Sequence, residues 1–420
     1  MDDKNTNKQF RLYDASGKYI KLSVDETIAR GLNKWPNWKC SAGVRALYID
    51  YDGNVWRCNS MSGRQTDNFN KAGWQKILLE LKKTYPTPLP PTLTTEQWQQ
   101  HDKLLAEFRR TEDGYNNKML PNNEETKKTK KGYLGNIVDG FDIEDEWGSC
   151  PWDSCGCGAD VILSKVKDDS YKPLLAVTNN SWAGKESTTT NLVNEVDDIV
   201  ANEMNFPIPY QILWDLGRQC NYDCSYCWPN VHNRHEPHKD YQSLINTCDL
   251  AIDRWSKGES IRWNFGGGEP TLHPKFLDVL KHLKSRNQWT MVTSNGTRDY
   301  KYWSEAVKYL NSINLSAHFD GLLSDREEDR FVKNVQAICK HFDEHNDDYW
   351  LEIKLMAPPQ YVDKAINLKQ KILDNTTISQ PGANNRIKGV LSLVPIRGLF
   401  GKSGQLIEYT QEQLEKFQYQ

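Results

Sequence analysis

The pattern of apolar and polar positions changes near residue 210. From there, short segments rich in β-branched and aromatic residues alternate with segments whose apolar residues recur at helical spacing. Six such strand–helix units in succession predict an α/β fold, a partial (β/α)6 TIM-like barrel rather than a closed eight-stranded one. The strand candidates are residues 210–216, 260–265, 289–294, 312–318, 349–356 and 387–394.

A clear helix candidate is the segment 273–286, "HPKFLDVLKHLKSR", in which Pro274 suits a first helical turn. Its apolar face consists of Phe276, Leu277, Leu280 and Leu283. In folds of this kind the chemistry lies where parallel strands end, at the carboxyl edge of the sheet. The loops that come after the strands are therefore the places to look for functional residues.

Residues 1–165 have a different pattern, which is typical of a smaller α+β domain. The segment "ALYIDYDGNVWRC" predicts a β-hairpin with Asp52 and Gly53 at its turn. Two amphipathic helices separated by a Pro-rich connector are expected at residues 71–83 and 94–110.

The remaining boundaries come from changes in polarity. Residues 166–205 are polar and are predicted to link the two domains. Residues 206–400 then form the barrel, and residues 401–420 form a C-terminal helix and tail.

Length and charge restrict the class of protein. A chain of 420 residues is long enough for two domains with a sizeable core. The formal charge is -3, and no segment forms the basic stripe of a duplex-binding surface, so a nucleic-acid polymer is not the favoured partner. The N-terminus has no apolar signal-peptide core and no segment has eighteen consecutive apolar residues, which predicts a soluble, cytoplasmic protein without a membrane partner.

The chain has ten cysteines, which indicate a reduced compartment and metal-binding thiolates more than a disulfide framework. Cys248 and Cys339 stand apart, each on the apolar face of a predicted helix, and are expected to be core residues. The other eight fall into three groups: Cys40 with Cys58; Cys150, Cys155 and Cys157; and Cys220, Cys224 and Cys227.

The last group, "CNYDCSYC", comes after the first barrel strand with the spacing C-x3-C-x2-C. A structural zinc site needs four ligands, and no second cysteine pair is present within the barrel. Iron–sulfur cubanes also normally take four cysteines. Three thiolates on one loop therefore predict a cluster with one iron left open for another ligand.

The second barrel strand ends in Gly266, Gly267, Gly268, Glu269 and Pro270. Glycines let a ligand approach the backbone, and a carboxylate accepts a charge-assisted hydrogen bond from an ammonium group. This loop is therefore expected to bind a ligand beside the cysteines.

The C-x3-C-x2-C loop after the first strand and G-G-E-P after the second together resemble the radical S-adenosylmethionine (radical SAM) enzymes. The resemblance implies that Cys220, Cys224 and Cys227 hold a [4Fe-4S] cluster, whose fourth iron binds the methionine amino and carboxylate groups of S-adenosylmethionine. It implies that Glu269, with backbone atoms of the glycine run, binds the methionyl ammonium.

The same resemblance suggests further cofactor contacts. Tyr226 occupies the aromatic position beside the last cysteine and would pack on adenine. Ser294, Asn295 and Ser316 lie at the ends of the third and fourth predicted strands, where family members contact the ribose or the methionyl carboxylate. The alternative for these three polar residues is a role in forming turns.

The stretch from Cys40 to Cys58 reads C-x12-G-x4-C and resembles the first half of a SPASM/twitch auxiliary-cluster domain. The segment "CPWDSCGCGAD" supplies Cys150, Cys155 and Cys157, so five candidates are present for the four positions of one auxiliary [4Fe-4S] cluster. Their C-x4-C-x-C spacing departs from the C-x2-C usual in twitch domains, which leaves open which two of the three bind. A zinc site that stabilises the hairpin is the alternative.

The order of the two domains differs from that of these relatives, in which the auxiliary domain comes after the barrel. The C-terminal segment "GQLIEYTQEQLEKFQYQ" resembles the helix that leads from barrel to auxiliary domain, and the N-terminal segment resembles the stretch next to that helix in the relatives. The sequence therefore indicates a circular permutation, which is tolerated where the original termini lie close together at the surface.

The resemblance implies an enzyme that cleaves S-adenosylmethionine reductively to a 5′-deoxyadenosyl radical and removes a hydrogen atom from a substrate. A one-electron donor such as flavodoxin or ferredoxin is implied, and an auxiliary cluster with four cysteines would accept an electron from the substrate. A peptide or small polar molecule is the expected substrate, and a nucleoside or nucleobase is the alternative. A non-catalytic iron–sulfur scaffold or redox sensor is the hypothesis from another class.

Three polar residues at the ends of the fourth and fifth predicted strands are candidates for facing the substrate. They are His318, Asp320 and Lys354, which would supply a proton acceptor after radical oxidation. A surface position or a salt bridge is the alternative role for each.

Overall fold

The fold comes from a computed structural model of the chain. It describes residues 9–13, 19–23, 38–58, 132–144, 148–149, 165–167, 175–179, 210–227, 233–322, 324–345, 349–378, 388–396 and 407–418. The predicted helices at 71–83 and 94–110 and the cysteines Cys150, Cys155 and Cys157 lie outside these described residues.

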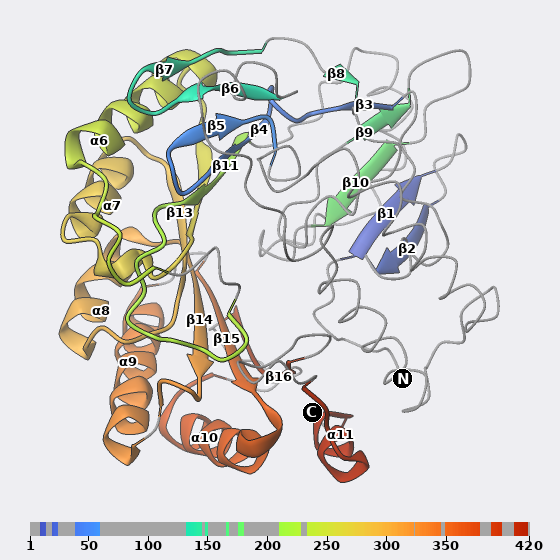
Figure 1. The fold of residues 1–420 in the computed structure, drawn as a ribbon, viewed down its shortest axis with the longest axis vertical. Helices are drawn as coiled ribbons and strands as arrows, with labels where there is room; N and C mark the ends of the chain where they lie inside the picture. The colour runs from blue at the N-terminus through green and yellow to red at the C-terminus, as the bar shows by residue number, and fades with distance from the viewer. Residues whose placement is uncertain are drawn as a thin grey trace.

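All six predicted barrel strands are present and run parallel in one sheet (Figure 1). Their order in this part of the sheet is β16-β15-β14-β13-β12-β11, and the sheet does not close on itself. The fold class is therefore α/β with a partial barrel, as predicted. The strands are β11 (Tyr210–Asp215), β12 (Ile261–Gly266), β13 (Trp289–Ser294), β14 (Ser312–His318), β15 (Trp350–Ala357) and β16 (Lys388–Pro395).

Helices cover one face of this sheet (Figure 1). Alternate strand residues such as Trp263 and Phe265 are buried against them, and the ring of Phe265 meets Phe276 at 5.3 Å. Cys248 and Cys339 are buried in this layer, which confirms them as core residues. The helices are α6 (Tyr241–Leu250), continued by a π-helical turn at Ala251–Trp255, α7 (Phe276–Ser285), α8 (Tyr300–Ala306), α9 (Asp325–Glu344) and α10 (Val362–Asn375).

Short elements complete this layer. Single 3-10 turns are found at Pro270–Leu272, Val307–Tyr309 and Pro359–Tyr361. The predicted C-terminal helix is α11 (Gln411–Gln418), whose Leu414 packs with Val362 of α10 and with Tyr409. Among the described residues, no helix is both long and apolar enough to span a membrane.

The predicted hairpin forms and extends the barrel sheet beyond β11. Strand β4 (Ala46–Ile49) pairs parallel with β11 and antiparallel with β5 (Asn54–Trp56), and Gly53 adopts a φ of +80° at the turn. Two further antiparallel strands, β6 (Tyr133–Asn136) and β7 (Gly140–Phe141), complete a ten-stranded sheet. The hydrogen-bonded sheet thus continues across the predicted domain boundary.

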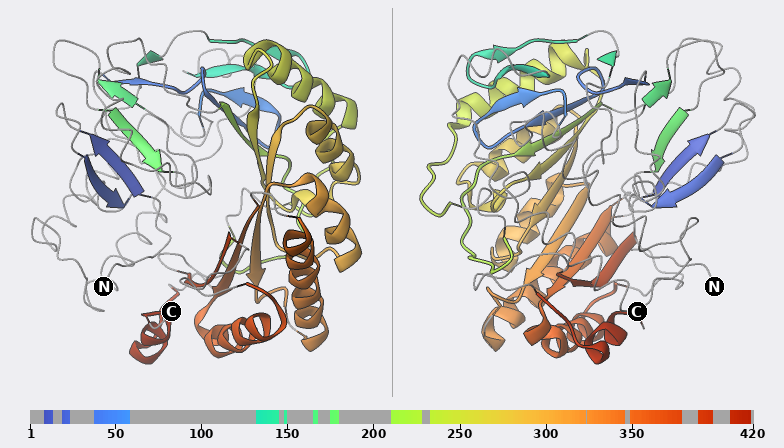
Figure 2. Two further views of the ribbon diagram at one scale, coloured as in Figure 1. Left: turned by 180° about the vertical axis from the view of Figure 1, so that it is seen from behind. Right: turned by 45° about the vertical axis from the view of Figure 1, so that its right-hand side comes forward.

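A second, smaller sheet lies on the side of the large sheet away from the helices (Figure 2). Its strand order is β2-β1-β10-β9-β3-β8, and its pairs are antiparallel. Strand β10, which lies within the predicted linker, pairs with β1, and β9, which overlaps the start of that linker, pairs with β3. The strands are β1 (Gln9–Tyr13), β2 (Tyr19–Ser23), β3 (Trp38–Cys40), β8 (Gly148–Ser149), β9 (Lys165–Lys167) and β10 (Leu175–Asn179).

Candidate functional site

The three-cysteine loop begins at the carboxyl end of β11 and lies against the loop after β12. Gly268 N donates to Gly217 O at 2.8 Å, and Glu269 N donates to Gln219 O at 2.8 Å. The backbone just before Cys220 is therefore held by the glycine run through main-chain hydrogen bonds.

This packing explains why the run consists of glycine. Gly267 has a φ of +108°, and a Cβ there would lie 2.5 Å from Gly217 O. A Cβ on Gly268 would meet Gln219 O and lie 2.6 Å from Arg218 O. The sequence had suggested that these glycines admit a ligand. In the structure, the segment that they admit is the chain's own cysteine loop.

Glu269 is buried and only 3% exposed. Its Oε1 accepts hydrogen bonds from Thr271 N at 3.1 Å, Thr271 Oγ1 at 2.5 Å and Ser294 Oγ at 2.8 Å, and Oε2 accepts from Asn295 N at 2.6 Å. Burial raises the pKa of Glu269, and these donors partly offset the shift. All four donors are uncharged, so a cation beside this carboxylate would offset the cost of burying its charged form.

Asn295 connects Glu269 to the cysteine loop. Its side-chain nitrogen donates to Asn221 Oδ1 at 3.0 Å and lies 3.7 Å from Cys220 Sγ. Ser294 and Asn295 thus lie where the third strand ends, as predicted, and both hydrogen-bond to Glu269. The sequence had not indicated that these residues form one network.

Tyr226 is buried, and its ring stacks on His318 at 5.8 Å. Its hydroxyl lies 2.8 Å from His318 Nδ1, and Asp320 Oδ2 accepts a hydrogen bond from Ser225 N at 2.6 Å. Burial lowers the pKa of His318 to about 4, so this imidazole is neutral at pH 7. His318 and Asp320, which were predicted to face the substrate, therefore contact the cysteine loop at Tyr226 and Ser225.

The third candidate, Lys354, lies on the neighbouring strand β15 and is paired in register with Ser316. Its Nζ forms a salt bridge of 3.2 Å with Glu352. Lys354 thus lies one strand away from the His318–Tyr226 contact. Its salt bridge with Glu352 matches the alternative role stated for it above.

The cysteine loop has the chemistry of a cluster site. The thiols are partly buried, and burial raises the pKa of Cys220 to about 11, with added contributions from the charges of Glu269 and Cys227. Burial, Asp320 and the neighbouring cysteines raise the pKa of Cys224 as well. Such thiols become thiolates when a metal centre compensates the charge.

A single metal ion and a cluster need different spacings of the thiolates. Within the described ranges, no three His, Cys, Asp or Glu side chains gather as the ligands of one ion. Zinc would require its thiolates about 3.8 Å apart, given Zn–S bonds of about 2.3 Å. A cubane binds each thiolate through a different iron, so its ligands are spaced more widely.

Arg218 joins the cysteine loop to the N-terminal hairpin. Its guanidinium forms two contacts with the Asp52 carboxylate, at 3.1 and 3.2 Å, and one with Glu236 at 3.1 Å. It also lies 4.9 Å from the ring centre of Tyr51. The turn predicted at Asp52 and Gly53 is thus in direct contact with the segment that leads to Cys220.

Cys40 and Cys58 lie together at the other end of the hairpin. Cys40 is buried, and the partly buried Cys58 packs against the cluster that Cys40 forms with two alanines. Cys40 is also paired in register with Gly148 of β8, a strand that ends one residue before Cys150 in the sequence. The end of β4 near Cys40 and the carboxyl end of the neighbouring strand β11 are about five residues apart along the strands, which is roughly 16 Å.

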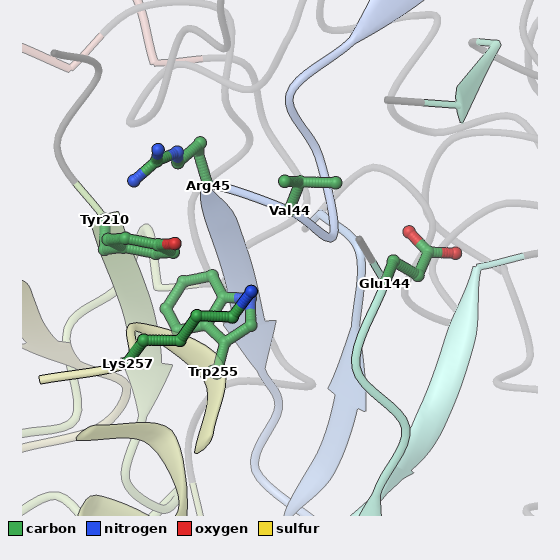
Figure 3. A pocket seen from close by; sticks show the side chains of 6 residues that line it. All are labelled: Val44, Arg45, Glu144, Tyr210, Trp255 and Lys257. Atoms are coloured by element: carbon green, nitrogen blue, oxygen red, sulfur yellow. The ribbon is translucent and has the colours of Figure 1, made fainter. Parts of the chain in front are cut away.

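A cavity of about 170 Å³ lies near the amino ends of β4 and β11 (Figure 3). Arg45 and Tyr210 line one side of it and Glu144 the other, and Glu144 is paired with Arg57 at 2.7 Å. The cysteine loop and Glu269 lie past the opposite ends of their strands, which is the edge where parallel sheets carry active sites. The cavity is therefore not part of the candidate site.

Asp215, Arg218 and Asn221 were missed by the sequence reasoning, although they flank the cysteines or lie among them. Tyr48 Oη donates to Asp215 Oδ2 at 2.5 Å, so this strand-end residue also contacts the hairpin. Their position could have indicated them, because they occupy the end of the first barrel strand and the loop after it, where active-site residues of such folds lie.

An open parallel sheet with three cysteines after its first strand and a buried glutamate after its second defines a radical SAM domain. A model of the radical SAM superfamily matches residues 214–352, which confirms that this part of the chain belongs to the superfamily. Membership implies a [4Fe-4S] cluster and S-adenosylmethionine as cofactors.

The chain is similar to several curated proteins over this region. It is 31% identical over 84 residues to the tungsten-containing aldehyde ferredoxin oxidoreductase cofactor-modifying protein of Pyrococcus furiosus, which covers 20% of this chain and 23% of that protein. It is 29% identical over 112 residues to GTP 3′,8-cyclase of Pasteurella multocida, covering 26% and 32%. It is 22% identical over 123 residues to mycofactocin maturase MftC of Mycobacterium ulcerans, covering 29% and 32%.

The chain thus spans about a quarter to a third of the length of these relatives. Among solved structures, Streptococcus suis SuiB bound to the precursor peptide SuiA matches with a TM-score of 0.34 and 16% identity, covering 58% of this chain and 53% of that one.

Proposed function

We propose that the chain is a radical SAM enzyme that acts on a peptide or a small polar molecule. When bound, the cluster and S-adenosylmethionine supply the reductive cleavage that gives a 5′-deoxyadenosyl radical, which removes a hydrogen atom from the substrate. The observation that carries the proposal is the continuous network from Cys220 through Asn295 to the buried Glu269.

In this proposal each part of the network has a physical task. The thiolates of Cys220, Cys224 and Cys227 hold three irons. Glu269 has one oxygen with a single donor, so it has capacity left to accept a hydrogen bond from the methionyl ammonium. Asn295 positions Glu269 relative to Cys220 because it donates to both the glutamate and the cysteine loop.

The remaining predicted contacts have the same geometric basis. The hydroxyl of Tyr226 is engaged by His318, which fixes the orientation of the ring proposed to pack on adenine. Ser316 lies near the end of β14, two residues before His318 and on the strand next to Ser294, and stays proposed as a contact of the ribose or the methionyl carboxylate. His318 and Asp320 are proposed to position the loop, because both contact it directly.

The test is anaerobic incubation of the reconstituted chain with S-adenosylmethionine and dithionite, with 5′-deoxyadenosine measured by chromatography. We expect 5′-deoxyadenosine from the wild type and none from the Cys220→Ala, Cys224→Ala, Cys227→Ala triple variant. A Cys248→Ala variant is the matched control, because Cys248 is buried in the helix layer and should leave product formation intact. A chain that keeps its iron but forms no 5′-deoxyadenosine would support the scaffold or redox-sensor alternative.

We also propose an auxiliary [4Fe-4S] cluster held by Cys40, Cys58 and two of Cys150, Cys155 and Cys157, which accepts an electron from the substrate. The contact of Cys58 with the Cys40 cluster, and the pairing of Cys40 with the strand before Cys150, support it. Two clusters require about eight iron and eight sulfide per chain, and the triple variant above should keep about half of each. Zinc together with only about four irons would contradict the auxiliary cluster and favour the structural zinc alternative.

The reversed domain order is proposed to come from circular permutation. Met1 and Gln420 lie outside the described residues, so the proposal rests on the order of the motifs. Joining the two ends with a Gly/Ser linker of about ten residues and reopening the chain between Ser187 and Thr190 should give a folded protein with wild-type iron content. Insoluble or iron-free protein from this rearrangement would count against a permutation.

A further inference from the structure

A partly buried ion pair lies beside the two N-terminal cysteines. Arg57 directly precedes Cys58 in the sequence, and its Nε lies 2.7 Å from Glu144 Oε2. The side chain of Arg57 is only 13% exposed and that of Glu144 is 32% exposed. Burial raises the pKa of Glu144, and the positive charge of Arg57 partly offsets that shift. Each charge therefore compensates the other in a place that water reaches only in part.

The guanidinium of Arg57 also contacts the turn that follows Cys40. Its Nε and Nη2 donate to Ala42 O, at 3.3 and 3.2 Å. Ala42 is two residues after Cys40 and packs with it in one cluster, to which Cys58 adds its side chain. A single charged side chain thus connects the segment that carries Cys40 with the segment that carries Cys58.

Two glycines leave room for the pair. Gly43 has a φ of +88°, and a Cβ there would overlap Glu144 Oε2 and lie 3.1 Å from Arg57 Nε. A Cβ on Gly148 would overlap Arg57 Nη2 and lie 2.8 Å from Nη1. The backbone of two separate segments therefore packs directly on the charged atoms, which fixes the pair in its place beside the cysteines.

Stability alone does not account for such a pair. Apolar residues of similar volume often replace a buried ion pair without loss of stability, because desolvation of the two charges offsets their attraction. The position of the pair suggests another role. The reduction potential of an iron–sulfur cluster depends on the charges and hydrogen bonds around its thiolates.

The pair is close enough to act on both thiolates. Consecutive Cα atoms are about 3.8 Å apart, so the guanidinium of Arg57 lies within about 10 Å of both Cys40 and Cys58. At an effective dielectric constant of about 20, one unit charge at this distance changes an equilibrium that adds one electron by roughly tenfold. Together, the two opposite charges of the pair largely cancel at that distance.

We propose that Arg57 and Glu144 set the reduction potential of the auxiliary cluster by keeping the net charge beside Cys40 and Cys58 near zero. This inference rests on the proposed function, because it requires the auxiliary cluster. In the proposed reaction the substrate radical is oxidised by loss of one electron to this cluster, and one negative charge is added there. Arg57 favours the added charge and Glu144 disfavours it.

The test uses the full chain with Cys220→Ala, Cys224→Ala and Cys227→Ala, so that the remaining iron belongs to the auxiliary site. The reconstituted protein is titrated anaerobically with dithionite, which supplies the electron, and the reduced cluster is followed by electron paramagnetic resonance. Arginine keeps its proton in proteins, so Glu144→Gln leaves an uncompensated positive charge. We expect this variant to favour the reduced form by roughly tenfold, which is about +59 mV for one electron.

The matched control is Glu259→Gln, which also removes a carboxylate from an arginine at this end of the sheet. Glu259 pairs with Arg45 at 3.5 Å and is 65% exposed, and Arg45 lies across the cavity from Glu144 (Figure 3). Solvent and salt screen such an exposed charge. The equilibrium constant of reduction should therefore change by less than about twofold in Glu259→Gln.

A double variant separates charge from packing. Arg57→Gln with Glu144→Gln removes both charges, so the potential should return to within about twofold, in equilibrium constant, of the value with the intact pair. A shift that stays in the double variant, or equal shifts in Glu144→Gln and Glu259→Gln, overturns the inference. Should the double variant bind no iron, the comparison of Glu144→Gln with Glu259→Gln decides alone.

Failure of the proposed function gives a different result. A triple cysteine variant that binds zinc or no metal contradicts the auxiliary cluster, and this inference with it. Iron that is bound but titrates with the same potential in every variant contradicts the inference alone.

Discussion

The contact between the glycine run and the cysteine loop predicts that Gly268 tolerates no side chain. In Gly268→Ala the new Cβ would overlap Gln219 O and lie 2.6 Å from Arg218 O, and both are backbone atoms that cannot rotate away. The loop would have to move, which costs about 1–3 kcal/mol for overpacking. Weakening the hydrogen bonds Gly268 N–Gly217 O and Glu269 N–Gln219 O, both 2.8 Å, adds about 1 kcal/mol.

Gly217→Ala is the matched control, because it lies in the same contact and is also glycine to alanine. A Cβ there meets only Glu236 Oε1 at 4.0 Å, and Gly217 is not in the left-handed region. The unfolding free energy of Gly217→Ala should stay within about 0.5 kcal/mol of the wild-type value.

The two variants are compared by urea unfolding and by iron content after reconstitution. We expect Gly268→Ala to lose about 2–4 kcal/mol of unfolding free energy and to bind less iron at the barrel site. Equal iron and stability in Gly268→Ala and Gly217→Ala would refute the reasoning, since only one of them places an atom inside the loop backbone.

Three further predictions concern single contacts. Glu269→Ala should retain its iron but weaken S-adenosylmethionine binding roughly 10- to 150-fold by calorimetry, because a charge-assisted hydrogen bond is worth about 1.5–3 kcal/mol; loss of iron would instead make Glu269 structural. Arg218→Met breaks the half-buried contact with Asp52 and should lower the unfolding free energy by about 1–2 kcal/mol in urea, with a change below about 0.5 kcal/mol contradicting a role in holding the hairpin. Burial lowers the pKa of His318 from 6.5 to about 4, so the unfolded chain binds a proton at a higher pH than the folded chain does. The unfolding free energy of the cluster-free wild type should therefore fall by up to about 3 kcal/mol as the pH is lowered from 6.5 to 4. His318→Gln should lose less unfolding free energy over the same pH range, and parallel curves for the two proteins would rule out a half-buried neutral imidazole at position 318.

The strands of the barrel were predictable because their signal is local. Residues 289–294 and 312–318 were predicted with the bounds that the structure gives, since each is a short segment with strand-type periodicity between turn residues and a helical segment. The three-cysteine loop and the G-G-E-P stretch were likewise readable, because each is contiguous and comes after a strand.

The contacts that join these segments were not predictable, because they link residues far apart in the chain. The pairing of β4 with β11 depends on backbone hydrogen bonds between segments that are widely separated in sequence, and no local pattern selects that partner. The same holds for β9 and β10, which lie at the start of the predicted linker and within it, and which pair with β3 and β1. Local propensity in such strands is weak, and tertiary context decides.

The sequence by itself determined the residue types of the site, their order and the strands that present them, because spacing and periodicity are properties of neighbouring positions. Only the tertiary structure decided that Asn295 lies between Glu269 and Cys220 and that the glycines pack on the chain's own loop. Hydrogen bonding, close packing and desolvation depend on which atoms meet in space, and strand register and sheet order set those meetings.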